Sequence, residues 1–439
     1  MEIKRNNQVY ENLAERINRF PQGAPPTALL FDILKVLFTE KEASLAAQLP
    51  LKPFTVEKAA AIWKTDAATA RKNLDGLAAK ALIVDLEING RKEYALPPPM
   101  AGFFEFSMMR TRTDIDQKTL AELFYQYINV EEDFIKDLFV RGETKMVKVF
   151  VNESVLPETM AVEILDYERA SETIKSASHR GISLCYCRHK MLHNGRACKA
   201  PLDICMTFGG TAASLIKNGF AREVGVSEGL DQLARAHDLN LVQCAENVRD
   251  DAAFICNCCG CCCEALIAAR KFAFLRPVST TNFLPCIDRG ACTGCGKCVD
   301  ACPVEAMALV SANDPARPKA KTALLNGEIC LGCGVCARVC QSRSISMTAR
   351  ERRVITPATT AHRSVLMAIE RGKLQDLIFD NRALFSHRAM AALFGAILRL
   401  PPAKRIMASR QMKSVYLERL LERFGPGKGP APGSPEGRG

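Results

Sequence analysis

The chain has 439 residues, of which 48% are hydrophobic and 24% are charged, and its formal net charge is +11. This length exceeds the size at which one hydrophobic core usually stops growing, so we expect several domains, and the composition excludes wholesale disorder. The basic balance permits attraction to nucleic acid, acidic proteins or anionic membranes, although thiolate-bound metal clusters would add negative charge to the metal-loaded protein.

The chain's start and its cysteine content predict a cytoplasmic protein. The first ten residues (MEIKRNNQVY) are polar and lack the apolar segment of a secretory signal. The longest apolar run, Ala389–Leu398, is about half the ~20 residues that span a bilayer, so we expect no membrane span. Twenty cysteines in a reducing compartment favour metal ligation over disulfides.

Residues 1–100 contain no cysteine and end at a proline triplet that predicts a domain boundary. Helices are expected over Thr55–Trp63 and Asp66–Ala79, and Asn89-Gly90 predicts a hairpin turn between two strands. This order resembles the winged helix-turn-helix domain. The resemblance implies that the second helix enters the DNA major groove and that four cations contact the phosphate backbone: Arg71, Lys72, Arg91 and Lys92. A solvated helix face or a protein-docking module is the alternative.

The remaining chain divides by composition. Residues 101–180 are expected to form a helical connector, because apolar residues recur with 3.6 periodicity between Gln117 and Val140. A cysteine-rich iron-sulfur region (181–272), a ferredoxin module (280–348), a C-terminal helical region (355–425) and a disordered tail (426–439) follow. The expected fold class is therefore α+β and multidomain.

The ferredoxin module carries the spacing C-x2-C-x2-C-x3-C twice. The first run is Cys292, Cys295, Cys298 and Cys302, and the second is Cys330, Cys333, Cys336 and Cys340. Thiolates two residues apart can wrap one face of a four-iron cubane, with intervening glycines supplying backbone freedom. Structural zinc is the alternative, but it usually pairs two separated knuckles.

The doubled run resembles the bacterial two-[4Fe-4S] ferredoxin family, although Gln341 stands where that family has proline. The resemblance implies that the last cysteine of each run ligates the other cluster. One cluster would then be held by Cys292, Cys295, Cys298 and Cys340, and the second by Cys330, Cys333, Cys336 and Cys302. Ser311–Lys321 is expected to be a surface loop between the two halves.

A second group of cysteines lies upstream. Cys185, Cys187, Cys198 and Cys205 fall within 21 residues and supply a complete four-thiolate set. They predict a third iron-sulfur site, with one of the nearby histidines, His189 or His193, as an alternative ligand. Zinc or unligated thiols are the alternative, and each histidine by itself is expected to be a surface or supporting residue.

The stretch CNCCGCCC places six cysteines in eight residues, shortly after Cys244. They are Cys256, Cys258, Cys259, Cys261, Cys262 and Cys263. Such a density indicates a soft metal or a redox role. The triplet Cys258-Cys259-Gly260 is similar to the CCG element of heterodisulfide-reductase-type subunits, which hold noncubane clusters, and the order of cysteine runs is similar to uncharacterised ferredoxin-domain proteins of anaerobes.

The predicted function is iron-sulfur electron transfer, in which single electrons pass between redox partner proteins through two [4Fe-4S] clusters and at least one additional cluster. A subunit of an oxidoreductase fits the same pattern. A G-x-G-x-x-G after a strand and a phosphate-binding loop are both missing, which disfavours a self-contained nicotinamide or ATP-driven enzyme. Two alternatives stay open: a redox-responsive DNA-binding regulator, and a scaffold that donates metal clusters.

Overall fold

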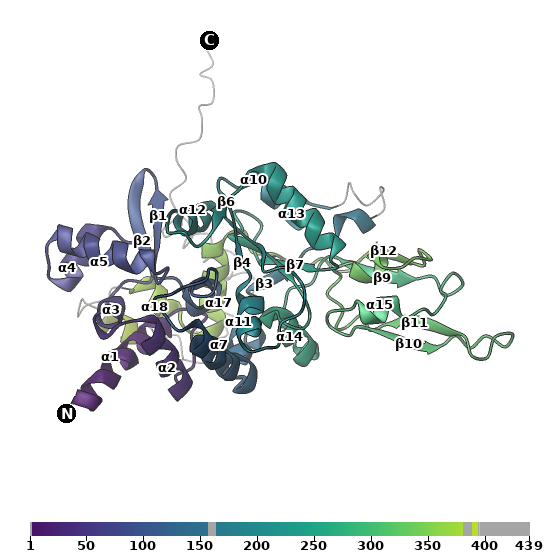
Figure 1. The fold of residues 1–439 in the computed structure, drawn as a ribbon, viewed down its shortest axis with the longest axis horizontal. Helices are drawn as coiled ribbons and strands as arrows, with labels where there is room; N and C mark the ends of the chain where they lie inside the picture. Colours follow the sequence, from purple (N-terminus) through teal and green to yellow (C-terminus); the bar gives the residue numbers. More distant parts are fainter. Residues whose placement is uncertain (1, 157–163, 381–388, 394, 396–439) are drawn as a thin grey trace, which may run out of the picture.

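The computed structural model describes residues 2–156, 164–380, 389–393 and 395 (Figure 1). Its N-terminal part contains α1 (Glu2–Ile17), α2 (Ala28–Leu37), α3 (Glu40–Ala46), α4 (Val56–Trp63), α5 (Ala67–Ala79) and the hairpin β1 (Val84–Ile88) and β2 (Arg91–Ala95). Asp66 caps α5 by accepting a hydrogen bond from the Thr69 N–H at 2.8 Å. Asn89 and Gly90 both have positive φ, as a two-residue hairpin turn requires. The expected helices and hairpin are confirmed.

The connector begins with η1 (Pro99–Phe103) and α6 (Phe104–Phe106). The helical stretch expected from Gln117 to Val140 is divided into α7 (Gln117–Tyr125), η2 (Gln126–Val130), α8 (Asp133–Ile135) and η3 (Lys136–Val140). It is interrupted at Glu132, which has a φ of 62°. Leu120, Phe124 and Tyr127 of its apolar face are buried. Beyond it the chain is not helical throughout, because β3 (Val147–Val149) joins a large sheet.

That sheet has six strands in the order β3-β7-β8-β5-β4-β6, and all paired neighbours are antiparallel. Its other strands are β4 (Arg180–Leu184), β5 (Asp203–Phe208), β6 (Arg222–Glu223), β7 (Val242–Glu246) and β8 (Phe254–Cys258). The helices in this part of the chain are α10 (Ala170–Ser176), α11 (Tyr186–His193), α12 (Gly209–Lys217), α13 (Val226–Asp238) and α14 (Glu264–Lys271), with short turns η4 (Glu153–Val155), η5 (Asp166–Glu168) and η6 (Ala273–Leu275).

The two faces of this sheet have different chemistry, because successive side chains in a strand point to opposite faces. Ile182, Met206, Ala245 and Ile255 form an aliphatic core with residues of α10 and α13. On the alternate positions β5, β7 and β8 carry cysteines, and Cys244 lies directly opposite Cys256 across the β7–β8 pair. One face is therefore an ordinary hydrophobic core, and the other presents thiols.

The ferredoxin module lies at the end of the molecule opposite α1–α5 (Figure 1). β9 (Phe283–Ile287) pairs antiparallel with β12 (Ile345–Ala349), and β10 (Met307–Ser311) with β11 (Lys321–Leu325); α15 (Lys297–Asp300) and α16 (Val335–Arg338) follow cysteine loops. The segment between β10 and β11 is mostly exposed, which confirms the expected surface loop.

The C-terminal helices α17 (Thr360–Arg371) and α18 (Leu374–Ile378) follow the ferredoxin module, and the chain here contacts the N-terminal part again. Arg371 donates a hydrogen bond to the Pro21 carbonyl at 2.8 Å, and Lys373 to the Phe20 carbonyl at 2.9 Å. Most of the helical region expected beyond α18, and the tail at 426–439, lie outside the described residues. In the part of the chain that is described, no helix combines the length and apolarity needed to cross a bilayer.

Candidate metal centres and the adjoining cavity

The eight cysteines of the ferredoxin module form two groups. Cys340 lies with Cys292, Cys295 and Cys298 in an outer group, in which Cys295 is exposed. Cys302 lies with Cys330, Cys333 and Cys336 in an inner group, in which burial raises the pKa of the Cys333 thiol to about 12. A buried thiolate is costly unless a metal compensates its charge. Backbone N–H groups of Ala306 and Gly332 also donate to Cys302 and Cys330 Sγ at 3.2 and 3.4 Å.

Residues 291–353 match the family model of the 4Fe-4S dicluster domain. The chain therefore carries a dicluster domain that holds two [4Fe-4S] clusters, and the iron-sulfur prediction for this segment is confirmed. Comparison with curated proteins and with solved structures returned no match for the chain. The cysteines of the dicluster domain fit its cofactor, because each group offers four sulfurs, three from one glycine-containing loop and one from the other cysteine run, and each group also receives backbone N–H donors.

The eleven upstream cysteines are arranged differently from the sequence-based grouping. Cys198 does not share a site with Cys185, Cys187 and Cys205 but comes together with three residues of the CNCCGCCC stretch. The sulfurs of this compact thiol site lie within 4.8 Å of one another and belong to Cys198, Cys259, Cys261 and Cys262. A tetrahedral ion with metal–sulfur bonds of about 2.3 Å requires sulfurs about 3.8 Å apart. The distances of 3.5 Å for Cys198–Cys259 and 3.7 Å for Cys261–Cys262 are close to that value.

The compact thiol site also has a cationic neighbour. Arg188 of α11 places its Nη2 3.6 Å from Cys259 Sγ. A hydrogen bond from Cys262, together with the Arg188 charge, lowers the pKa of Cys259 to about 5, whereas burial raises the pKa of Cys261 to about 11. Cys259 is therefore deprotonated near neutral pH, as a metal ligand must be, before any ion binds.

The other upstream cysteines form what we call the thiol ring. Interactions between neighbouring thiols link six of them in a closed circuit, and Cys244 interacts with two members of it. The thiol ring consists of Cys185, Cys187, Cys263, Cys258, Cys256, Cys205 and the added Cys244. Neighbouring thiols lower the pKa of Cys185 and Cys263 and raise the pKa of Cys187 and Cys205. Seven soft ligands are more than one tetrahedral ion uses.

The inner group and the cysteine-rich stretch are in direct contact. Gly260 packs against Pro303, the residue after Cys302, so closely that a Cβ at position 260 would lie 2.6 Å from the Pro303 carbonyl oxygen. Val304 and Cys330 also share a hydrophobic core with Cys258 and Cys263. The dicluster domain and the cysteine face of the sheet are therefore parts of one packed unit.

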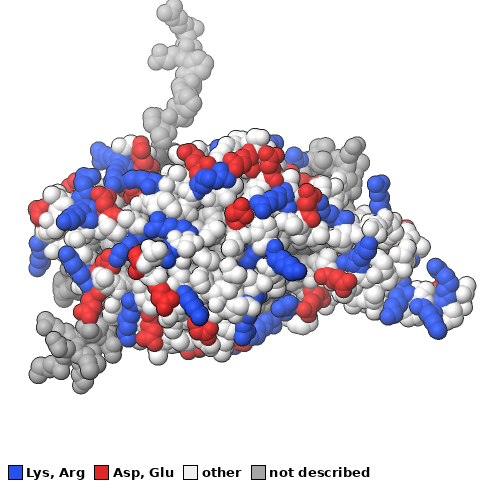
Figure 2. Space-filling view, in the orientation of Figure 1, with Lys and Arg blue, Asp and Glu red and all other residues white. Residues whose placement is uncertain are grey.

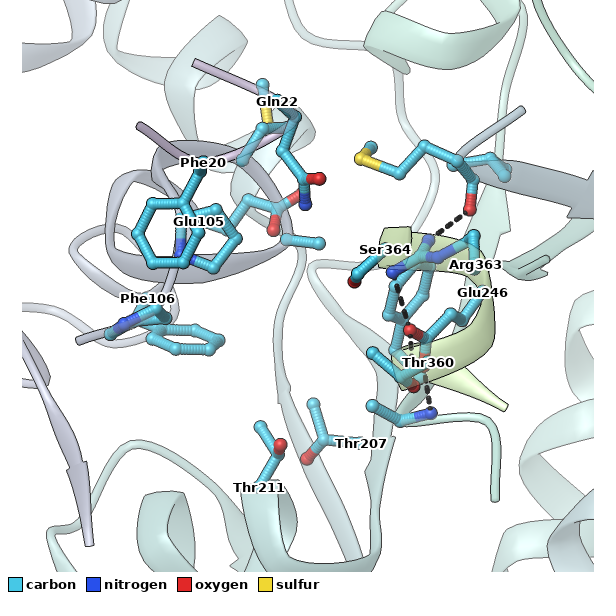
Figure 3. Close-up of a pocket in the computed structure, with 18 of the residues that line it drawn as sticks. Phe20, Gln22, Glu105, Phe106, Thr207, Thr211, Glu246, Thr360, Arg363 and Ser364 are labelled. Atoms are coloured by element: carbon cyan, nitrogen blue, oxygen red, sulfur yellow. Dashed lines mark hydrogen bonds and ion pairs between the residues drawn. The ribbon is translucent and has the colours of Figure 1, made fainter. Parts of the chain in front are cut away.

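A cavity of about 680 Å³ extends from the thiol ring over the same face of the sheet. Its walls come from the N-terminal part, the sheet, α12 and α17, and they include Glu105, Thr207, Glu246 and Arg363 (Figure 3). Pockets of this size are large enough for a small organic molecule.

The four basic residues expected to contact DNA are all exposed. Lys92 is paired with Asp75 at 2.8 Å, so one of these charges is already offset. Figure 2 shows other Lys and Arg side chains over this end of the molecule, intermixed with acidic ones. The positions of these four residues do not by themselves identify a nucleic-acid-binding surface.

Sequence reasoning named the ring cysteines other than Cys244 as candidate ligands but did not group them in this way, and it did not find Arg188 or Glu105 as site residues. The available signal was the alternation of cysteine with Ala245 along β7 and with Ile255 along β8. This period of two is typical of a strand and would have placed the cysteines on one face of a sheet. His189 and His193 contact each other at 3.2 Å, and His189 also contacts the Met108 carbonyl at 2.7 Å. Neither of these contacts involves a cysteine of the site, and a supporting role for the two histidines stays a prediction.

Proposed function

We propose that this protein transfers single electrons between redox partners, through the two clusters of the dicluster domain, to a further iron-sulfur cluster held by the thiol ring. The observation that carries this proposal is the contact between Gly260 and Pro303, which joins the inner group to the cysteine-rich stretch. Electrons arriving at the inner cluster would have a short path to the thiol ring.

The outer group supplies the position at which a partner would dock. Cys295 is exposed, and exposed Arg289, Lys297, Lys319 and Lys321 lie in the same part of the dicluster domain. Figure 2 shows Lys and Arg side chains gathered at this end of the molecule. Basic side chains around an exposed cluster would steer an acidic redox protein into contact.

The compact thiol site has a separate role in this proposal. Its sulfur spacing matches a single tetrahedral ion such as zinc, and a four-iron cubane needs ligand sulfurs further apart because each is bound to a different iron. Bound there, the ion would connect Cys198 to the stretch that carries three of the seven cysteines of the thiol ring. Zinc would then stabilise the loop, and the thiol ring would hold iron and sulfide.

The test is metal analysis and EPR of the anaerobically purified full chain. We expect more than about 8 iron and 8 sulfide per chain, the amount that two four-iron clusters require, with a third EPR signal on reduction. The double variant Cys185→Ser/Cys263→Ser should lose that excess and keep both dicluster signals. Equal iron content in the variant and the wild type would refute the third cluster.

A redox-responsive DNA-binding regulator is the second candidate, because the N-terminal hairpin is physically coupled to the sheet region. Asp85 of β1 accepts a hydrogen bond from the Ser214 hydroxyl of α12 at 2.7 Å and its backbone N–H donates to the same hydroxyl at 3.1 Å. Lys217 of α12 pairs with the same carboxylate. A DNA affinity that changes with cluster oxidation would favour this candidate.

A further inference from the structure

The cavity beside the thiol ring continues directly from the thiols along the strands. Thr207 lies two residues beyond Cys205 on β5, and Glu246 two residues beyond Cys244 on β7. Each therefore shares a face of the sheet with a ring cysteine, at a Cα spacing of about 7 Å. Both residues line the cavity. A molecule bound over them would therefore lie next to the thiol ring.

The cavity has mainly apolar walls and little uncompensated charge. Phe106, Met109 and Phe254 are among its apolar residues. The Arg363 guanidinium is bonded to Glu246 at 2.7 Å and to the Met146 carbonyl at 2.7 Å, and these residues lie together on one wall (Figure 3). Since these charges neutralise each other, this wall suits an uncharged ligand.

Hydrogen-bonding groups lie on separate sides of this apolar space. Glu105 and Gln22 are on one side, and Thr207 and Thr211 on another (Figure 3). The hydroxyls of Thr207 and Tyr186, which also lines the cavity, are buried and make no hydrogen bond to any residue that the structure describes. Burial raises the pKa of Glu105 to about 8, with a contribution from the charges of Cys263 and Cys185. A protonated carboxyl and free hydroxyls are donors, so they fit acceptor oxygens on a ligand.

We propose that this cavity binds a quinone, an uncharged and largely apolar molecule with two carbonyl oxygens, and that the thiol-ring cluster reduces it. The two carbonyls match the donors on separate walls. A quinone also accepts electrons one at a time, as iron-sulfur clusters deliver them. This inference rests on the proposed electron-transfer function and adds to it a terminal acceptor.

The reaction balances with the groups available. Two electrons reach the quinone one after the other from reduced clusters, which an external one-electron donor protein reduces again. Each carbonyl becomes a hydroxyl, so two protons are needed. Glu105 supplies one proton, and solvent supplies the other and reprotonates Glu105. The product is a hydroquinone, and each cluster returns to its oxidised state.

Calorimetric titration of the oxidised full chain with 2-methyl-1,4-naphthoquinone tests binding without any electron flow. Ser364 lines the cavity from α17, and Ser364→Phe should place an aromatic ring in the binding space and abolish saturable binding. Thr207→Val removes one donor and should weaken binding about 2- to 10-fold, as loss of one hydrogen bond does. Thr173→Val, on α10 at the opposite face of the sheet, is the control and should bind like the wild type.

The iron and sulfide content of each sample separates this inference from the proposed function. A wild type with excess iron but no saturable binding, or equal binding by wild type and Ser364→Phe, overturns the quinone site alone. Missing excess iron overturns the third cluster instead. A quinone with an isoprenoid tail distinguishes the source: tighter binding of the tailed form supports a membrane quinone, and equal or weaker binding supports a soluble one.

Mixing the reduced protein with quinone tests the reduction step. We expect one hydroquinone for every two cluster electrons, and a saturable rate of cluster oxidation that Ser364→Phe loses. Equal rates in the two proteins would show that exposed clusters react directly with free quinone and would overturn reduction in the cavity.

Discussion

The sulfur of Cys198 lies 3.5 Å from the sulfur of Cys259, although 61 residues separate them in the chain. This spacing suits thiolates on one tetrahedral ion. We therefore predict that Cys198→Ser removes about one zinc per chain and leaves iron and sulfide unchanged. Cys205→Ser, in the thiol ring, should show the opposite pattern. Elemental analysis of anaerobic preparations checks both, and loss of iron from Cys198→Ser would assign the compact thiol site to an iron cluster.

Gly260 tests the junction between the dicluster domain and the cysteine face. A methyl group at this position meets the backbone of Pro303, which has little freedom to move, so Gly260→Ala should lower the free energy of unfolding by about 1–3 kcal/mol. It should also slow electron transfer from the dicluster domain. Gly76→Ala in α5 is the matched control, since no atom of the described residues lies within 4 Å of its added methyl and helix propensity favours alanine by about 1 kcal/mol. Denaturation midpoints of the two variants measure the difference in stability. If both variants were destabilised equally, the close contact between Gly260 and Pro303 would be contradicted.

In the dicluster domain, the last cysteine of each run is expected to bind the cluster of the other run, and this assignment can be tested for each cluster separately. Cys340 lies with Cys292, Cys295 and Cys298, so Cys340→Ser should alter the EPR signal of the outer cluster. Cys302→Ser should alter that of the inner cluster. Spectra in which each substitution damages the cluster of its own cysteine run would contradict this assignment.

Glu105 makes stability depend on pH. The unfolded carboxyl loses its proton near its ordinary pKa of 4.5, whereas the folded one keeps its proton to about pH 8. Between these values the folded state binds more protons, so the free energy of unfolding falls as pH rises. Glu105→Gln cannot titrate and should gain stability relative to the wild type across this window. Urea denaturation at stepped pH measures the difference, with Glu11→Gln on the exposed side of α1 as control; parallel curves for the wild type and Glu105→Gln would refute the prediction.

Any DNA affinity of the N-terminal part should be weak and sensitive to salt. Neutralising Arg71 and Lys72, for example to Gln, should reduce the slope of log K against log salt by about 2, because each phosphate contact contributes about 0.9. Lys175→Gln on α10 is an exposed control. Binding isotherms on a labelled duplex at several salt concentrations provide the slope. Tight, sequence-selective binding that changes with cluster oxidation would contradict the electron-transfer proposal and support the regulator function.

Features encoded over short distances were predictable from the sequence. The dicluster cysteines lie two or three residues apart, and the matched family model covers them. Asp66 and the Asn89-Gly90 pair likewise act within a few residues, so the α5 cap and the hairpin appear where expected. The helical stretch expected from Gln117 to Val140 is divided because Glu132 adopts a left-handed conformation, which apolar periodicity does not reveal.

The grouping of the upstream cysteines was decided only by the tertiary structure. Pairing of β7 with β8 brings Cys244 opposite Cys256, and Cys205 enters the same face from β5. Cys258 and Cys259 are adjacent in the chain, yet one belongs to the thiol ring and the other to the compact thiol site. Successive side chains at the end of a strand point to opposite sides, so the position of each thiol depends on how the strands assemble and not on its distance along the sequence.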